Sequence, residues 1–234
     1  MITFGSKFIR DNSDTQLRWL PMDTERLFKE NMSIPSKRKQ LEQLDWNSNS
    51  ILYDLNRYGF RGEIIEDCDL VALGCSFTMG IGVKQDSIWC SVVAKELNRS
   101  LTNLGSGGAG LDTVFRIADH WLPKLKPKHV LLLTPPGDRI EVFADDIPTI
   151  YSIEDHNKFG NRDWWATDIN FELYNRRSLM AIELLCVQNQ CKLTVIDSEE
   201  NIKYLDRGRD LVHPGPLSHR HIANLFIDLI QKDF

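Results

Sequence analysis

The chain alternates short apolar runs with longer segments of helical periodicity, and this alternation is the strongest constraint on its fold. The apolar runs that we expect to form buried strands are 69–75, 101–104, 129–134 and 192–197. Segments whose apolar residues recur at helical spacing are 86–98, 111–125, 173–188 and 216–232. Strands and helices in this order predict right-handed βαβ units in a doubly wound parallel sheet. We therefore predict an α/β fold with ligands bound beyond the carboxyl ends of the strands.

Two regions do not follow the alternation. Residues 1–66 are polar and weakly periodic, and we predict that they form an N-terminal extension packed on a core domain of residues 67–234. Residues 138–172 are irregular and rich in acidic and aromatic side chains, including Trp164 and Trp165. Long insertions after a strand often act as lids or substrate loops, and we predict that role for this one.

Composition excludes several classes of protein. The net charge is −5 and the basic residues form no stripe, so we expect no nucleic-acid partner. No segment approaches the roughly 20 apolar residues of a membrane span, and the first residues lack a signal peptide's apolar region, which predicts a cytoplasmic chain without membrane contact. The five cysteines form no CxxC pair, which indicates reduced thiols and no zinc site.

The first predicted strand ends in the sequence LGCSFTMG, residues 73–80. Gly74 allows a sharp turn, after which Ser76 begins a helix. A helix N-terminus favours developing negative charge, so this position suits an attacking hydroxyl. The alternative is a serine that has only a structural role in a tight turn.

The second predicted strand ends in NLGSGGAGLD. Gly105, Gly107 and Gly110 satisfy the dinucleotide pattern GxGxxG, but that pattern belongs after the first strand and needs an acidic residue at the end of the next. Here the next strand ends in threonine and two prolines, which argues against a nucleotide site. The glycines either offer a backbone N–H to an oxyanion or allow a tight turn with close helix packing.

The sequence DLVHPGPLSHRHIA precedes the last predicted helix. Asp210 lies three residues before His213, where a carboxylate can orient an imidazole and stabilise its charged form, as a serine nucleophile requires of its base. His219 and His221 lack ligand spacing with His213, so we predict that they lie on the surface of a helix and bind no metal.

Together these motifs resemble those of the SGNH (GDSL-type) hydrolases, a family of serine esterases and acylhydrolases. The resemblance runs from about residue 58, including NRYGFRGE, to the C-terminus. It implies a flavodoxin-like three-layer α/β/α sandwich, with Ser76 as nucleophile and Asp210 and His213 as its partners. It also implies that the backbone N–H groups of Ser76 and Gly108 form the oxyanion hole.

The sequence departs from the family pattern in its third block, LLLTPPGDRIE. Gly137 takes the position of an asparagine that donates to the oxyanion, and losing one such donor typically costs about 10²- to 10³-fold in turnover. Arg139 and Asn161 are candidates to replace it. In addition, Cys75 takes the place of an acidic residue before the nucleophile. The rival α/β-hydrolase fold would need GxSxG, but Thr78 stands where the second glycine belongs.

We therefore predict an esterase that works through an acyl-serine intermediate and needs neither a metal nor an organic cofactor. The predicted substrate is a small-molecule or carbohydrate ester, with Arg139, Trp164 and Trp165 as substrate-binding residues. Because tryptophans stack on sugars, we favour an O-acetyl group on a carbohydrate. The alternative is a catalytically degenerate member of the fold with a binding or structural role, which the missing asparagine favours.

Overall fold

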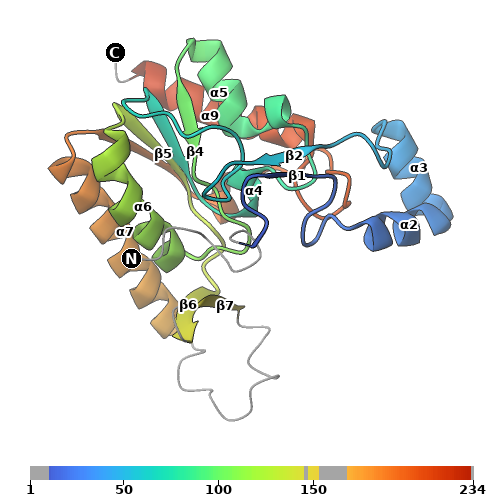
Figure 1. Cartoon of the computed structure of the whole chain (residues 1–234), viewed down its shortest axis with the longest axis horizontal. Helices are drawn as coiled ribbons and strands as arrows, with labels where there is room; N and C mark the ends of the chain where they lie inside the picture. The colour runs from blue at the N-terminus through green and yellow to red at the C-terminus, as the bar shows by residue number, and fades with distance from the viewer. Residues whose placement is uncertain (1–10, 145–146, 153–167, 233–234) are drawn as a thin grey trace.

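The computed structural model describes residues 11–144, 147–152 and 168–232. A parallel sheet of order β4-β3-β5-β8 lies at its centre (Figure 1). Its strands are β3 (Leu70–Leu73), β4 (Leu101–Asn103), β5 (His129–Leu133) and β8 (Lys192–Ile196). The chain leaves β3 toward β4 on one side and returns to β5 on the other. The predicted doubly wound parallel sheet is therefore confirmed, with its topological switch point between β3 and β5.

Helices cover both faces of this sheet (Figure 1). The helices are α5 (Trp89–Leu97) and α9 (Pro216–Lys232) on one face, and α6 (Leu111–Leu125) and α7 (Asp168–Gln188) on the other. Side chains alternate across β3: Leu70 and Ala72 pack with α5 and α9, whereas Val71 and Leu73 pack with α6 and α7. This arrangement confirms the predicted three-layer α/β/α sandwich.

The bounds of α6 and α9 agree with the sequence periodicity, and two other helices differ from it. The predicted helix 86–98 is divided into a 3₁₀ turn, η1 (Gln85–Ser87), and α5, because Ile88 between them is extended (φ −66°, ψ 138°). Helix α7 begins five residues before the predicted start at 173, and buried Phe171 anchors this added turn. The predicted strand 69–75 ends early because Gly74, at φ +151°, turns the chain.

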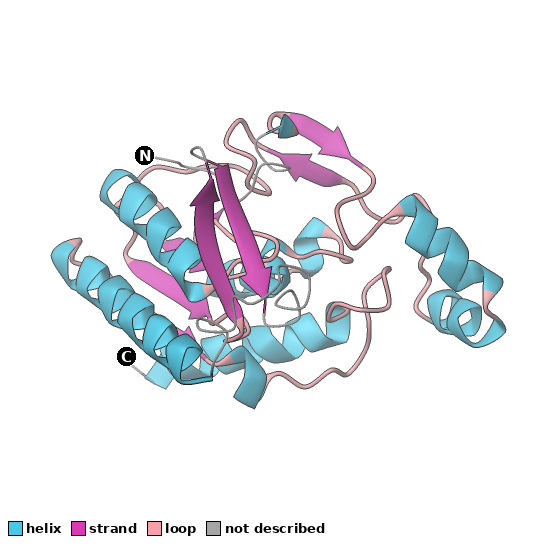
Figure 2. Ribbon diagram, turned by 90° about the horizontal axis from the view of Figure 1, so that it is seen from below, coloured by secondary structure: helices cyan, strands magenta, loops and turns pink. Residues whose placement is uncertain are grey.

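Residues 11–66 contain helices and strands of their own. They form a two-stranded antiparallel sheet of β1 (Thr15–Leu17) and β2 (Tyr53–Leu55), and the helices α2 (Glu25–Ser33) and α3 (Pro35–Gln43). Figures 1 and 2 show α2 and α3 as a pair to one side of the sheet layers. Buried side chains of this segment, including Leu41, Trp46, Ile51 and Tyr53, belong to the same apolar cluster as α5 and α9.

The insertion predicted as irregular at 138–172 contains an antiparallel hairpin. Its strands are β6 (Arg139–Ala144) and β7 (Ile147–Ser152), paired from Arg139 opposite Ser152 to Ala144 opposite Ile147. The prediction missed the hairpin because β6 carries charged as well as apolar residues and β7 contains a proline. The predicted Asn161, Trp164 and Trp165 lie outside the described residues. Across the described parts of the chain, no helix combines the length and apolar character that a membrane crossing needs.

Asp69 connects the amino-terminal ends of neighbouring strands. Its carboxylate accepts hydrogen bonds from Lys128 Nζ (2.7 Å) and from the backbone N–H and hydroxyl of Ser100 (both 3.0 Å). These contacts, the Lys128 bond foremost, hold the pKa of Asp69 well below its usual range. A depressed carboxyl pKa stabilises the fold above the unfolded pKa of about 4, and this stabilisation is lost as the pH falls below it.

We expect Asp69→Asn to lower the melting temperature by about 3–6 °C at pH 7, as for a loss of about 1–2 kcal/mol of hydrogen bonding and charge. The difference from wild type should shrink steadily toward pH 2, because there the unfolded wild-type chain binds a proton at Asp69 that the folded chain does not. Thermal unfolding followed by circular dichroism from pH 2 to pH 7 tests this. A difference that stayed constant with pH would show that the carboxylate charge is not what stabilises the fold.

Candidate active site

A cavity of about 600 Å³ lies where the chain leaves the carboxyl ends of the central strands. Ser76 reaches it after β3, Gly107 and Gly108 after β4, and Arg139 after β5. His213 enters it from the loop before α9. The structure therefore brings together Ser76, Gly108, Arg139 and His213 of the residues singled out from the sequence.

Ser76 begins the short helix α4 (Ser76–Met79) directly after the turn at Gly74. Only glycine fits at 74, because a Cβ there would lie 2.2 Å from Thr78 Oγ1 and 2.6 Å from Leu133 O. The Ser76 side chain is nearly buried, and within the described chain its hydroxyl has one hydrogen bond, a long one of 4.0 Å to Cys75 Sγ. Among the described residues, the hydroxyl at the cavity therefore has no strong hydrogen-bond partner.

Asp210 and His213 form a hydrogen-bonded pair. His213 Nδ1 bonds to Asp210 Oδ2, and the backbone N–H groups of Val212 and His213 donate to Asp210 Oδ1 at 2.9 and 3.0 Å. The Phe77 ring packs edge-on against the imidazole, with centroids 5.8 Å apart. With Nδ1 engaged by the carboxylate, Nε2 is the imidazole nitrogen left to exchange a proton in the cavity.

Two backbone N–H groups can stabilise negative charge in this cavity. Ser76 is the first residue of α4, so its N–H has no acceptor within the helix. Gly108 has φ +79°, a conformation that glycine adopts without strain. Gly105 serves packing instead, since a Cβ there would lie 2.3 Å from Met79 N. The glycine cluster therefore combines close packing against α4 with backbone exposed to the cavity.

Asn175 of α7 lies beside Gly137, the residue at the family's asparagine position. Its Nδ2 donates to Gly137 O at 2.7 Å and lies 3.1 Å from where a Cβ on Gly137 would be. A carboxamide from a distant helix thus fills part of the space that the missing side chain would take. Arg139 lines the cavity, and its Nη1 donates to Ala109 O at 3.3 Å.

The prediction that His219 lies on the surface is wrong. His219 is fully buried, and its Nδ1 accepts the backbone N–H of Trp89 at 3.2 Å. Burial, aided by the charges of Arg61 and His213, lowers the pKa of His219 to about 3. His221 is partly exposed. Within the described residues no cluster of histidine, cysteine and acidic side chains could hold a metal ion.

Sequence reasoning missed several residues around the site. Leu20, Pro21 and Met22 of the N-terminal segment line the cavity, and nothing in their local sequence indicates this. Arg61 is buried and donates to the carbonyl oxygens of Gly80 and Val83, just after α4. Arg61 belongs to the motif NRYGFRGE, which is the signal in the sequence that could have indicated it.

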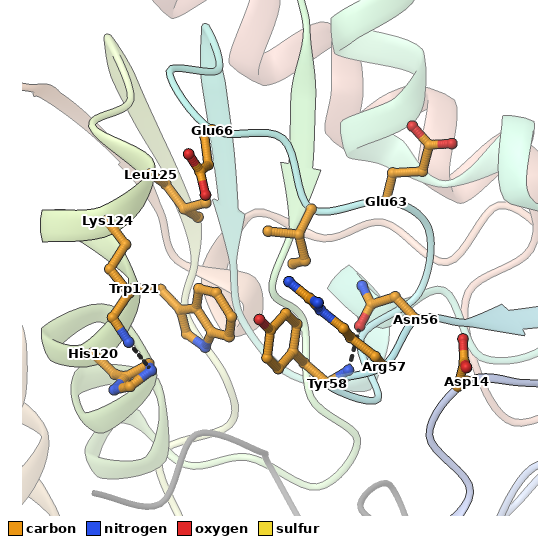
Figure 3. Close-up of a pocket in the computed structure, with 11 residues that line it drawn as sticks. Asp14, Asn56, Arg57, Tyr58, Glu63, Glu66, His120, Trp121, Lys124 and Leu125 are labelled. Carbon is orange, nitrogen blue, oxygen red and sulfur yellow. Dashed lines mark hydrogen bonds between the residues drawn. The ribbon is translucent and has the colours of Figure 1, made fainter.

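A second cavity of about 520 Å³ lies between the N-terminal segment and α6 (Figure 3). Tyr58 and Trp121 meet there edge to face, with ring centroids 4.7 Å apart. The described residues that line it include charged side chains but no serine, threonine or cysteine. It therefore offers no side-chain nucleophile of the kind found in the first cavity.

No protein-family model and no curated protein sequence matches the chain. Similar solved structures include an acetyl xylan esterase from the rumen bacterium Butyrivibrio proteoclasticus, at 14% identity and a TM-score of 0.42. They also include a G-D-S-L family lipolytic protein from Veillonella parvula (15%, 0.37) and a family two carbohydrate esterase from Clostridium thermocellum with cellohexaose (14%, 0.41).

The three matches cover 74%, 70% and 74% of this chain, in the order given. They cover 65%, 98% and 66% of the other chains, so this chain spans about two thirds of each carbohydrate esterase. At these identities the likeness concerns the fold alone. The G-D-S-L family is the one whose motifs the sequence resembles.

His219 should make the fold sensitive to acid. Its pKa is about 3 when folded and about 6.5 when unfolded, so below pH 6.5 the unfolded chain binds the additional proton. As the pH is lowered below 6.5, we expect the free energy of unfolding to fall more steeply in wild type than in His219→Gln. The difference between the two slopes should reach up to about 1.4 kcal/mol per pH unit. Glutamine keeps an acceptor for Trp89 N–H. Urea unfolding between pH 4 and pH 7 measures both slopes, and equal slopes would contradict the assignment.

Proposed function

We propose that the chain is a serine esterase or acylhydrolase of the SGNH type that forms an acyl-serine intermediate. The observation that carries this proposal is the Asp210–His213 hydrogen bond at the cavity that also holds the weakly bonded Ser76 hydroxyl. An imidazole oriented by a carboxylate and a serine at a helix start are the parts that acyl transfer needs.

In the proposed reaction, Ser76 Oγ attacks the ester carbonyl while His213 Nε2 accepts its proton. The tetrahedral oxyanion is stabilised by the N–H groups of Ser76 and Gly108. His213 then protonates the leaving alcohol, and the C–O bond breaks to give the acyl-serine. Water attacks this intermediate with His213 again as base, which releases the acid and restores Ser76. Asp210 keeps the imidazole oriented throughout.

The cavity suits the acyl part of an ester substrate. Its walls are largely apolar, formed in part by Met22, Phe77 and Ile81, and Arg139 is the one lysine or arginine among the described residues that line it. Arg139 is therefore our proposed contact to the polar part of the substrate. From Trp164 and Trp165 in the sequence, we further propose that this part is a carbohydrate and that the acyl group is an acetyl group.

A second candidate function is ligand binding without turnover. Gly137 in place of a donor favours it, as does the absence, within the described chain, of a hydrogen bond between Ser76 and His213. We rank it second for two reasons. A chain without catalysis has no physical need of the Asp210–His213 pair. In addition, the serine hydroxyl and the imidazole of such enzymes often approach each other only when substrate binds, so the missing hydrogen bond does not exclude catalysis.

Labelling with a fluorophosphonate probe tests for an activated nucleophile. We expect one adduct at Ser76, located by mass spectrometry, and its loss in Ser76→Ala and in His213→Gln. Ser152 lines the same cavity, so Ser152→Ala is the matched control and should label like wild type. A folded wild-type chain that stays unlabelled would favour the binding role.

Restoring the third oxyanion donor tests whether its loss limits the rate. Gly137→Asn alone should give the smaller gain, because the new Cβ would lie 3.1 Å from Asn175 Nδ2, which has to move to make room. The double variant Gly137→Asn with Asn175→Ala frees this space, and we expect kcat on a small acetyl ester to rise about 10- to 100-fold. Asn175→Ala alone is the control. A double variant no faster than wild type would mean that another group already supplies the contact.

A further inference from the structure

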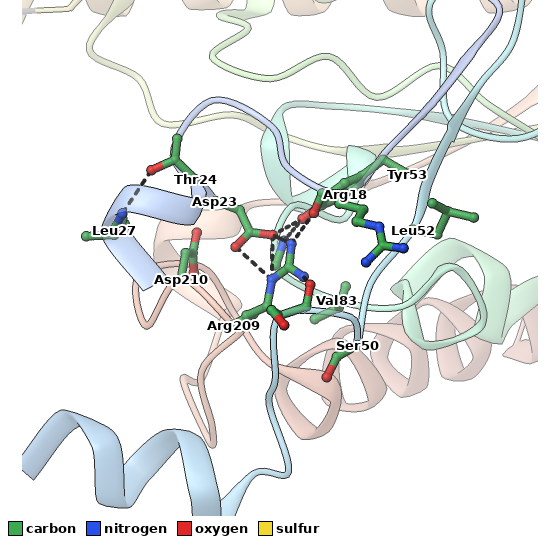
Figure 4. A network of polar contacts seen from close by, with 12 residues as sticks. Arg18, Asp23, Thr24, Leu27, Ser50, Leu52, Tyr53, Val83, Arg209 and Asp210 are labelled. Carbon is green, nitrogen blue, oxygen red and sulfur yellow. Dashed lines mark hydrogen bonds and ion pairs between the residues drawn. The ribbon is translucent and has the colours of Figure 1, made fainter. Parts of the chain in front are cut away.

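The loop that carries Asp210 is held by a buried ion pair with the N-terminal segment (Figure 4). Arg209 Nε donates to Asp23 Oδ1 at 3.1 Å, and its Nη2 donates to Asp23 Oδ2 at 2.7 Å. Their side chains are 0% and 1% exposed. Arg209 directly precedes Asp210 in the chain, so the position of its guanidinium restricts where the Asp210 backbone can lie.

The rest of the Arg209 guanidinium is also satisfied by residues before 50. Its Nη1 donates to Ser48 O at 3.2 Å and its Nη2 to Arg18 O. The guanidinium carbon lies 3.9 Å from the centre of the Trp19 ring. A guanidinium is always charged, so this buried cation depends on the N-terminal segment for its counter-ion and most of its acceptors.

Two further bonds connect this segment to the same loop. Asn31 Nδ2 donates to the backbone oxygen of Asp210 at 3.3 Å, and both residues are buried. Trp46 Nε1 donates to the backbone oxygen of Arg207 at 3.1 Å. The backbone on both sides of Arg209 is therefore fixed from outside the three-layer core.

Asp23 also reaches the loop that follows the serine. The Tyr53 hydroxyl donates to Asp23 Oδ2 and accepts the N–H of Gly82 at 2.8 Å. The backbone N–H of Arg209 in turn donates to the backbone oxygen of Gly82 at 2.8 Å. One carboxylate thus connects the loop after Ser76 with the loop before His213.

We propose that Asp23 is a positioning residue for the active site. Through Arg209 and Tyr53 it sets the relative placement of the Asp210–His213 pair and the loop after Ser76. The residues just before it, Leu20 to Met22, line the catalytic cavity, and Met22 is held at φ +75°. The N-terminal segment is therefore part of the catalytic architecture. The catalytic consequence rests on the proposed function, whereas the positioning of His213 does not.

The test is Asp23→Asn in the full chain, which keeps the size of the side chain and removes its charge. The first readout is the low-field proton resonance of His213 Nδ1–H bonded to Asp210, assigned by its loss in His213→Gln. The second is kcat and KM on a small acetyl ester. We expect the resonance to vanish or shift, and kcat to fall at least about tenfold with KM within about threefold, as for a misplaced catalytic group.

Asp69→Asn is the matched control, since it also removes an ion-paired carboxylate but lies at the amino-terminal ends of the strands, opposite to the site. It should keep both the resonance and kcat. If Asp23→Asn does not fold, Tyr53→Phe carries the test, because it removes only the hydroxyl between Asp23 and Gly82; the same shift of resonance and fall of kcat are expected.

A folded variant with the resonance in place and kcat unchanged would overturn the proposal, and so would a wild-type chain without the resonance. Inactive wild type whose resonance is lost in Asp23→Asn would instead overturn the proposed function and leave the positioning role standing.

Discussion

The close approach of three strand ends is the constraint on which the site depends. Side chains at Gly74 or Gly105 would collide with α4 or with the end of β5, at separations of 2.2–2.6 Å. Without them, α4 fits between the ends of β4 and β5 with its first N–H at the cavity. Ser76 can therefore occupy its position only because Gly74 and Gly105 carry no side chain, and a methyl group at either glycine would displace it.

Two buried arginines hold the loop that follows α4 and the loop that carries Asp210. Arg61 binds the carbonyl oxygens of Gly80 and Val83, and Arg209 binds Asp23 beside the Asp210 loop. Burial lowers the pKa of Arg61 to about 10, so it stays charged at neutral pH. Burying two cations costs desolvation energy that apolar side chains would not cost. Their directional hydrogen bonds fix the backbone of these loops in one geometry, which apolar contacts would not specify.

The central fold could be predicted because its signals are local. Periodicity located α6 and α9, and the motifs placed Ser76, Gly108 and His213 at strand ends that the topology brings together. His219 could also have been predicted as buried, since it shares a helical face with Ile222, Phe226 and Ile230. The Asp23–Arg209 pair could not, because its members are 186 residues apart and nothing local to either indicates the other.

The buried Asp23–Arg209 pair has a consequence for how the sequence can evolve. A lineage that lost the acid at 23 would leave a guanidinium buried without a counter-ion, and one that lost the arginine at 209 would leave a buried carboxylate. Either change alone is costly, whereas replacing both by apolar residues need not be. Among descendants of this chain the two positions should therefore change together or not at all, and the first 60 residues should be inherited with the strands and helices that follow them.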